Sequence, residues 1–346
     1  MLRKNIRFLV IFIILATISI LMIKKTNEEC SFVDLCDEIS RANILWIILA
    51  VVVMPGFIFF EGMALKVLVK GLTNRKTHIK GMLYSSADIY FSAITPSASG
   101  GQPASAYFMM RDRIPGSVTT VILLVNLMLY SLSFVITGTI AFLMDWKVFL
   151  GYGAFGKTLV LIGIGAMLFL MFSFYILLRR KQIINVLASC LIRLGHKIRI
   201  VKDPEKKMEK LFSVLENYEK CSYSIAGKKK MIIFALIFNV LQRISQSFVT
   251  VFCYLAVGGQ PGKAVKVWVV HMMASLGANS IPIPGGVGTT DYLLIRGLKN
   301  VDSTINSARL TLISRGISFY GCIFISMIII FIGYTMLNRG DKQGLS

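Results

Sequence analysis

Long apolar stretches separated by short basic stretches make up most of the chain. Six of the apolar stretches predict transmembrane helices, because crossing the hydrocarbon core of a bilayer takes about 20 apolar residues. They comprise residues 8–23, 44–69, 117–144, 159–178, 231–257 and 308–337. Nothing in the chain shows the two-residue alternation of a membrane barrel. The pattern therefore predicts an all-α integral membrane protein with about six full spans.

Two further apolar segments are interrupted by Gly- and Pro-rich sequence. Residues 82–94 lead into Gly100-Gly101, and residues 265–283 lead into Gly285-Gly286; each break is followed by a short helical run. In lipid, such breaks would leave backbone groups without hydrogen-bond partners unless they face protein or water. Paired interruptions of this kind point to a binding site in transporter-like folds. We therefore expect two re-entrant helical hairpins, the alternative being ordinary loops between helices.

Basic residues set the predicted orientation. The chain of 346 residues carries 38 Lys and Arg against 17 Asp and Glu, a net charge of +21, and such an excess normally lies in cytoplasmic loops. Its distribution predicts that both termini and residues 181–230 are cytoplasmic, whereas the acidic loop 26–41 and the turn 258–263 are external. Within 181–230, Ile and Leu recur at helical spacing among lysines, so we expect amphipathic cytoplasmic helices on anionic lipid.

In this topology the two hairpins enter the membrane from opposite sides. Residues 44–144 would form one repeat and residues 231–337 a second, inverted-topology repeat. Both would belong to a single membrane domain that covers residues 1–346. One observation opposes this arrangement: Arg296 and Lys299 fall on the external side, against the usual distribution of basic residues.

Composition excludes several other classes of function. The chain is 55% hydrophobic, with a mean hydropathy of +0.70, which leaves little sequence for a soluble catalytic domain. The basic charge fits cytoplasmic loops and lipid head groups, so we expect no nucleic-acid partner. Six cysteines and three histidines are scattered without metal-ligand spacing, and we expect neither a metal nor a cofactor. Cys30 and Cys36 share an acidic loop and could be either bonded or free.

Polar residues recur every three or four positions within three of the spans, on one face of each helix. Two of these stripes contain an arginine, Arg243 and Arg315. Because a charge at mid-membrane is costly unless it is paired or hydrated, both should face an interior cavity, with Glu61, Asp88 or Asp291 as counter-charges. A guanidinium also binds phosphate through paired N–H groups. A structural ion pair is the alternative for each arginine.

The hairpins add a second means of binding an anion. Short helices that start after Gly101 and Gly286 would point their N-terminal amides and positive dipole ends towards the membrane centre. Glycines in both breaks would also leave room for a ligand to approach the backbone closely. These features suit a polar head group, in particular a phosphodiester.

Together the two motifs resemble the membrane domain of lysylphosphatidylglycerol synthases, a pattern shared by many free-standing bacterial and archaeal proteins. The resemblance covers roughly residues 5–337. Its matching residues are Gly100, Gly101, Pro103 and Arg111 in the first motif, and Pro284, Gly285, Gly286, Gly288, Asp291 and Arg315 in the second. The sequence departs from the common pattern at Gln102, where an acid is frequent, and at Asp291, where Glu is usual.

The resemblance implies a multi-pass protein of a bacterial or archaeal plasma membrane. In the full-length synthases this domain resembles a flippase that moves aminoacylated phosphatidylglycerol to the outer leaflet, while a separate cytosolic domain makes that lipid. The chain ends at Ser346, just after the last predicted helix. We therefore expect no covalent chemistry by this chain alone, although the family name phosphatidylglycerol lysyltransferase could attach to it.

We expect a lipid flippase or scramblase that translocates a phospholipid, such as aminoacylated phosphatidylglycerol, or a lipid-linked head group. The alternative is a phosphatidylglycerol lysyltransferase-type enzyme, or the membrane half of a lipid aminoacyl- or glycosyltransferase that needs a separate cytosolic partner. Anionic phospholipid is the expected substrate and environment, and the oligomeric state is left open. The expected substrate-binding residues are Gly100, Gly101, Gln102, Pro103, Arg111, Arg243, Gly285, Gly286, Gly288, Asp291 and Arg315, with Glu61 and Asp88 as counter-charges.

Overall fold

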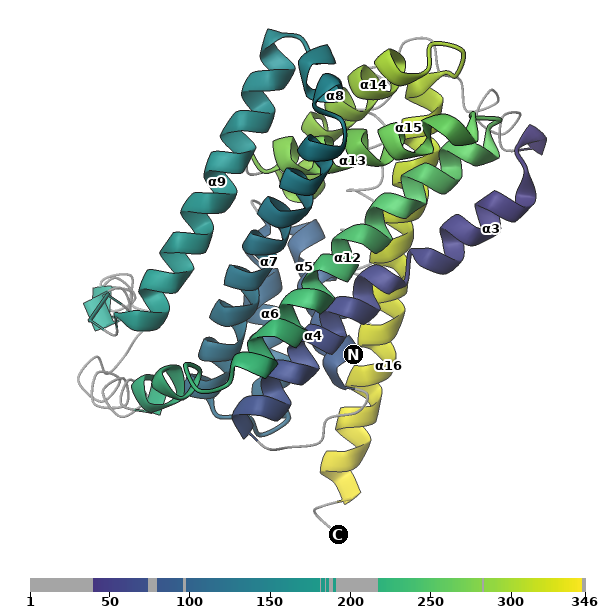
Figure 1. Ribbon diagram of the computed structural model, residues 1–346. Coiled ribbons are helices and arrows are strands. Elements are labelled where there is room, and N and C mark those ends of the chain that lie inside the picture. Colours follow the sequence, from purple (N-terminus) through teal and green to yellow (C-terminus); the bar gives the residue numbers. More distant parts are fainter. Residues whose placement is uncertain are drawn as a thin grey trace.

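The chain folds into a bundle of helices (Figure 1). The computed structural model describes residues 40–73, 80–95, 98–180, 182–183, 185–186, 189–190, 217–281 and 283–343. Every regular element in these ranges is helical, and no strand occurs within them. The predicted first span, the two cysteines of the acidic loop and most of the predicted amphipathic segment lie outside the described residues.

Five stretches of the described helices are long and apolar enough to cross a membrane. They are Ile44–Thr73, Gly116–Met144, Ala154–Arg179, Lys229–Ala256 and Ser307–Thr335. Each coincides with a span that the sequence predicted. The prediction of an all-α, multi-pass membrane protein is therefore confirmed.

The long helix α12 (Lys229–Ala256) runs across the front of the bundle in Figure 1. Five of the described helices pack against it: α3 (Ile44–Val53), α4 (Gly56–Thr73), α7 (Gly116–Met144), α13 (Ala264–Ala278) and α15 (Ser307–Arg315). On the outer side of α7 lies α9 (Ala154–Arg179), which follows the short helix α8 (Trp146–Gly151). The buried face of α12 includes Asn239, Gln242 and Arg243, so the centre of the bundle is polar.

Two of the predicted single helices are interrupted. The predicted helix over 44–69 divides into α3 and α4 at Pro55, whose ring and missing N–H disturb a helix interior. The predicted helix over 308–337 consists of α15 (Ser307–Arg315), a π-helical turn η4 (Gly316–Gly321) and α16 (Cys322–Gln343). Single π-helical turns inside α-helices are frequent at functional sites, and this one begins directly after Arg315.

Both Gly-rich breaks form the turns of helical hairpins. In the first, α5 (Lys80–Ile94) packs against α6 (Gly101–Arg111); in the second, α13 packs against α14 (Thr289–Val301). The turn of the second hairpin, η3 (Pro284–Gly286), contacts α5. In Figure 1 α13 and α14 lie in the upper part of the bundle and α5 and α6 lie lower. The hairpins therefore reach the middle of the molecule from opposite ends.

The first hairpin is closed at its base by an ion pair. Lys80, at the start of α5, pairs with Asp112, directly after the end of α6, and the hydroxyl of Tyr84 donates to the same carboxylate. This carboxylate is almost fully buried, whereas the lysine is half exposed. The two ends of the hairpin therefore lie side by side.

The second hairpin has a base of the same chemistry. Lys263, directly before α13, lies 3.2 Å from Asp302, directly after α14, and the Tyr254 hydroxyl donates to that carboxylate at 2.8 Å. Hydrogen bonds from the side chain of Thr304, followed by those from Tyr254 and Lys263, hold the pKa of Asp302 well below its usual range, although burial opposes the shift. In each hairpin, the start of the first helix and the end of the second therefore lie together at the base of that hairpin.

Candidate functional site

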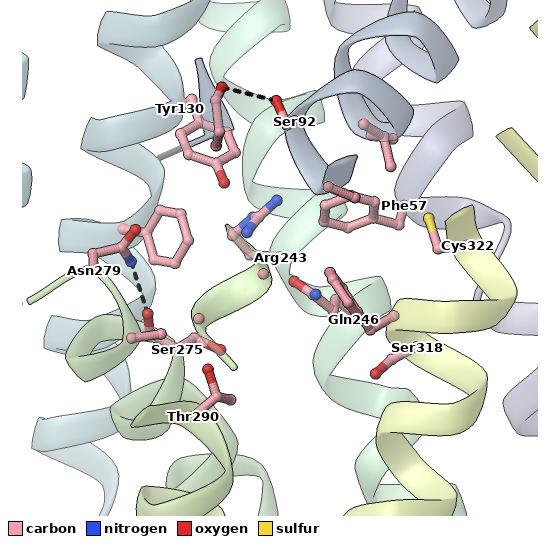
Figure 2. Close-up of a pocket in the computed structure, with 18 of the residues that line it drawn as sticks. Phe57, Ser92, Tyr130, Arg243, Gln246, Ser275, Asn279, Thr290, Ser318 and Cys322 are labelled. Atoms are coloured by element: carbon pink, nitrogen blue, oxygen red, sulfur yellow. Dashed lines mark hydrogen bonds between the residues drawn. The ribbon is translucent and has the colours of Figure 1, made fainter. Parts of the chain in front are cut away.

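A cavity of about 500 Å³ lies at the middle of the bundle. The tips of both hairpins, α4, α7, α9, α12 and the segment from α15 to the start of α16 contribute to its walls. In Figure 2 the Arg243 side chain lies at the centre, between Tyr130 and Phe57, with Asn279 and Thr290 from the second hairpin nearby. The two Gly- and Pro-rich interruptions identified in the sequence therefore meet at one cavity.

Arg243 is held mainly by aromatic rings. Its guanidinium carbon lies 4.7 Å from the ring centre of Phe57 and 4.6 Å from the ring centres of both Tyr130 and Phe134. Only 5% of the residue is exposed, and its Nε and Nη2 atoms have no hydrogen-bond partner among the described residues. Cation–π contacts contribute about 2 kcal/mol when desolvated, so the rings stabilise the charge while leaving N–H groups free.

Arg315 forms hydrogen bonds and an ion pair within the protein. Its Nη1 and Nη2 atoms each donate to the carbonyl oxygen of Gly285 at 3.1 Å, and its Nε lies 3.0 Å from Asp291 Oδ1. The Phe319 ring lies 4.9 Å below the guanidinium carbon. The structure thus brings together Arg315 and one of its three suggested counter-charges, and joins α15 to the second hairpin.

Glu61 and Asp88 lie at another wall of the cavity. Glu61 is 4% exposed and accepts a hydrogen bond of 2.8 Å from Gln242 Nε2. Asp88 accepts from Gln102 Nε2 at 2.7 Å and from Ser92 Oγ at 3.2 Å. Both carboxyl groups line the cavity that contains Arg243.

The hydrogen bond to Asp88 explains why an amide at position 102 suits this structure. The Gln102 NH₂ group donates to Asp88, whereas an ionised carboxylate in the same place could only accept. The departure from the common family pattern therefore adds a donor for a carboxylate that shares the cavity with another carboxyl group.

The glycines of the first turn are required by packing within the hairpin. A Cβ atom at Gly101 would overlap the Asp88 carboxylate and the Ser92 hydroxyl, and one at Gly100 would overlap the Thr95 side chain. From the sequence we expected glycine here to let a ligand approach the backbone closely. In the structure these glycines instead let α6 pack closely against α5.

In the second turn the backbone conformation requires glycine. Gly285 and Gly286 have φ values of +63° and +60°, a left-handed region that side chains disfavour. α14 begins at Thr289 rather than directly after Gly286, and the Gly288 N–H donates to Asp291 Oδ2 at 2.9 Å. The helix start is thus covered by its own aspartate.

The predicted site residues divide into three groups. Gln102, Arg243, Gly285, Gly286, Arg315, Glu61 and Asp88 line the cavity. Gly101 and Asp291 lie behind it, in contact with lining residues, and Gly100 packs against Thr95. Pro103 and Gly288 are exposed, and Arg111 lies over the Tyr334 ring at 5.5 Å. These last three do not line the cavity.

Several lining residues were not predicted as site residues. Phe57 and Phe134 complete the rings around Arg243, and His271 Nδ1 hydrogen bonds with Thr250 Oγ1 at 2.7 Å. Thr250 in turn lies 2.5 Å from Ser314 Oγ. The polar stripes on the spans contained Thr250 and Ser314, but the phenylalanines resemble ordinary apolar positions.

No group of three or more His, Cys, Asp or Glu side chains that could hold a metal ion occurs within the described ranges. The polar groups that line the cavity are two carboxyl groups, two guanidinium groups, the His271 imidazole, the Cys322 thiol and several hydroxyl and amide groups.

Comparison with known proteins gives one match. Residues 7–326 match the family described as the lysylphosphatidylglycerol synthase TM region. No curated protein and no solved structure matches the chain.

Proposed function

The chain belongs to the lysylphosphatidylglycerol synthase transmembrane-region family, and from that premise we propose that it translocates an anionic phospholipid between leaflets. Aminoacylated phosphatidylglycerol and lipid-linked head groups belong to the same proposed substrate class. The path for the head group is the central cavity, and the chain performs no covalent chemistry by itself. The membrane is proposed to be the plasma membrane of a bacterium or archaeon, with both termini in the cytoplasm.

The observation that carries this proposal is the state of Arg243. A buried cation is costly unless hydrogen-bond acceptors satisfy it, yet two of its nitrogen atoms have no partner within the described part of the chain. A phosphodiester offers oxygen acceptors and one negative charge, and guanidinium groups bind phosphate through paired N–H groups. The Arg243 side chain therefore suits a phosphate that enters the cavity.

The cavity has polar and apolar walls, as a lipid requires. Arg243, Gln246 and Asn279 present polar groups, whereas Met167, Leu170 and Phe174 of α9, among others, present apolar ones. The apolar side would receive the upper part of the acyl chains, and the polar side would receive the head group. Both are within a single cavity, so the head group need not cross bare hydrocarbon.

The two hairpins suggest how the cavity could open to either side. We propose that they are re-entrant and that residues 44–144 and 231–337 form inverted repeats. The matched Lys–Asp pairs at the hairpin bases and the approach of the hairpins from opposite ends support this arrangement. Small rigid-body movements of one repeat against the other would then expose the cavity alternately.

The proposal is tested in liposomes that contain the purified full-length chain and fluorescent phosphatidylglycerol. Without ATP, the protein should increase the fraction of probe that a membrane-impermeant reductant reaches, relative to protein-free vesicles. Arg243→Gln should reduce the rate at least about tenfold, since a charge-assisted bidentate contact contributes well above 1.4 kcal/mol. Arg296→Gln is the matched control, because Arg296 is exposed on α14 and does not line the cavity.

Two results would contradict this function. If the wild-type protein moves no more probe than protein-free vesicles do, translocation of anionic phospholipid is excluded. If it instead attaches an amino acid to phosphatidylglycerol when aminoacyl-tRNA is supplied, the enzymatic alternative is correct.

A further inference from the structure

Two carboxyl groups from different helices meet at the central cavity. Glu61 comes from α4 and Asp88 from α5, and both line the cavity together with Arg243. Two ionised carboxylates in one poorly hydrated cavity repel each other, while Arg243 offers them a single positive charge. A proton on one of the two removes this repulsion, as it does in other carboxyl pairs. With that proton the pair carries one negative charge, which matches the charge of Arg243.

Three side-chain donors position the two carboxyl groups. Gln242 donates to Glu61 Oε2, while Gln102 and Ser92 donate to Asp88. These donors come from α12, α6 and α5, so the pair is held by three helices.

The charges around the cavity balance in pairs. Arg315 is neutralised by Asp291 at 3.0 Å. Arg243 lines the same cavity as Glu61 and Asp88, so its charge balances the singly protonated pair. The other titratable side chains that face the pair or line the cavity are Tyr130 on α7, His271 on α13 and Cys322 at the start of α16.

A phosphodiester that binds Arg243 changes this balance. It adds one negative charge beside the Glu61–Asp88 pair, which already carries one. A second proton on the pair restores neutrality around the cavity.

We propose that an anionic head group enters the cavity together with one proton, which the Glu61–Asp88 pair takes up, so that translocation of the lipid is coupled to movement of a proton. This inference rests on the function proposed above and adds its driving ion. The proton comes from the solution on the side where the head group enters, and returns to solution where the head group leaves. On uptake an O–H bond of hydronium or water in that solution breaks and the O–H bond of the carboxyl group forms; release reverses this exchange, and no other bond changes.

The inference is tested by measuring proton uptake when the purified full-length protein binds dioctanoyl phosphatidylglycerol in weakly buffered detergent solution. A pH indicator should report uptake of about one proton for each lipid bound near neutral pH. Dioctanoylglycerol, which lacks the phosphate, should cause none. The double variant Glu61→Gln/Asp88→Asn should bind the phosphatidylglycerol without taking up a proton.

Asp145→Asn provides the matched control. Asp145 caps α8 through the backbone N–H of Lys147, lies outside the cavity, and asparagine caps a helix equally well. This variant should take up protons as the wild type does. Lipid binding with no proton uptake in the wild type, or with undiminished uptake in the double variant, would overturn the inference.

The wild-type protein gives a second measurement that needs no variant. Throughout the pH range in which binding takes up one proton, the dissociation constant for dioctanoyl phosphatidylglycerol should rise about tenfold for each pH unit. In liposomes, acid on the side of the probe should accelerate its movement. Binding and movement that are independent of pH would refute proton coupling while leaving the proposed function intact. Absence of both binding and movement would refute the proposed function itself.

Discussion

The two buried arginines are neutralised in different ways. Arg315 donates to a backbone carbonyl and pairs with Asp291, whereas Arg243 lies among aromatic rings with two nitrogen atoms lacking partners in the described part of the chain. An arginine whose N–H groups are paired within the protein stabilises the fold. An arginine that retains N–H groups without acceptors can bind a ligand. Substitution of the two should therefore have different consequences.

Arg315→Gln should mainly lower stability. The substitution removes the donors to Gly285 and leaves the Asp291 carboxylate without its cation. Breaking a buried ion pair costs about 3–5 kcal/mol, and partial exposure of this pair puts the expected loss near the lower value. Unfolding by heat or denaturant in detergent measures it.

A double-mutant cycle isolates the ion pair. Asp291→Asn removes the other charge, so the double variant Arg315→Gln/Asp291→Asn should be more stable than the sum of the single losses indicates. An interaction energy close to zero, together with complete loss of lipid movement in Arg315→Gln, would instead make Arg315 a ligand contact.

Part of the site could be predicted from the types of residue alone. An arginine within a membrane span is costly enough to indicate a cavity and an acidic partner, and this reasoning identified Arg243, Arg315 and Asp291. The rings around Arg243 could not be found in this way. Phe57 and Phe134 face Arg243 only because α4 and α7 are rotated in a particular way against α12. Tertiary packing sets that rotation.

At the scale of the elements, the first hairpin depends on close contact between its two helices. Gly101 begins α6 directly beside the Asp88 carboxylate and the Ser92 hydroxyl of α5. The same contact brings Gln102 to Asp88. The turn, the helix start and one wall of the cavity are therefore a single packed unit.

Gly101→Ala should disrupt this unit. The added methyl group would overlap Asp88 and Ser92, so the helices must separate, and overpacking of this kind costs about 1–3 kcal/mol. Gly165→Ala is the control, because Gly165 lies in α9 with no heavy atom near its added Cβ, and alanine favours a helix by about 1 kcal/mol over glycine. Thermal unfolding in detergent should show a lower midpoint for the first variant only. Equal midpoints would mean that the hairpin is not packed this tightly.

The sequence predicted where most of these elements lie, because apolar length and Gly–Pro breaks are local signals. It did not predict the division of the second span, since counting apolar residues ignores a proline such as Pro55. The π-helical turn after Arg315 could not be predicted either, because one changed hydrogen-bond register leaves no distinct residue pattern. The lysine–aspartate pairs at the hairpin bases link residues about thirty to forty positions apart, beyond the reach of local spacing.

At the scale of the whole molecule, the cavity is built by helices that are distant in sequence. α4 and α5 supply its carboxyl groups, α12 supplies Arg243, and the second hairpin closes it. The sequence indicated that the two hairpins are related, but their contact through η3 and α5 required the structure. The orientation of each hairpin relative to the two sides of the membrane is a separate question, and it decides whether the repeats are inverted.

Single-cysteine labelling tests that orientation. In a background with the six native cysteines replaced, positions 210 and 116 should react with a membrane-impermeant maleimide only after the cells are opened, whereas position 260 should react in intact cells. The reason is that residue 116 follows the base of the first hairpin, residue 260 precedes the base of the second, and basic segments such as 181–230 are retained on the cytoplasmic side. Gly116 is exposed and a Cβ there has only ordinary contacts, so the fold should tolerate the change. Reaction of positions 116 and 260 from the same side would show that both hairpins enter from one face and would rule out inverted repeats. Labelling of position 210 in intact cells would contradict the cytoplasmic location predicted for residues 181–230.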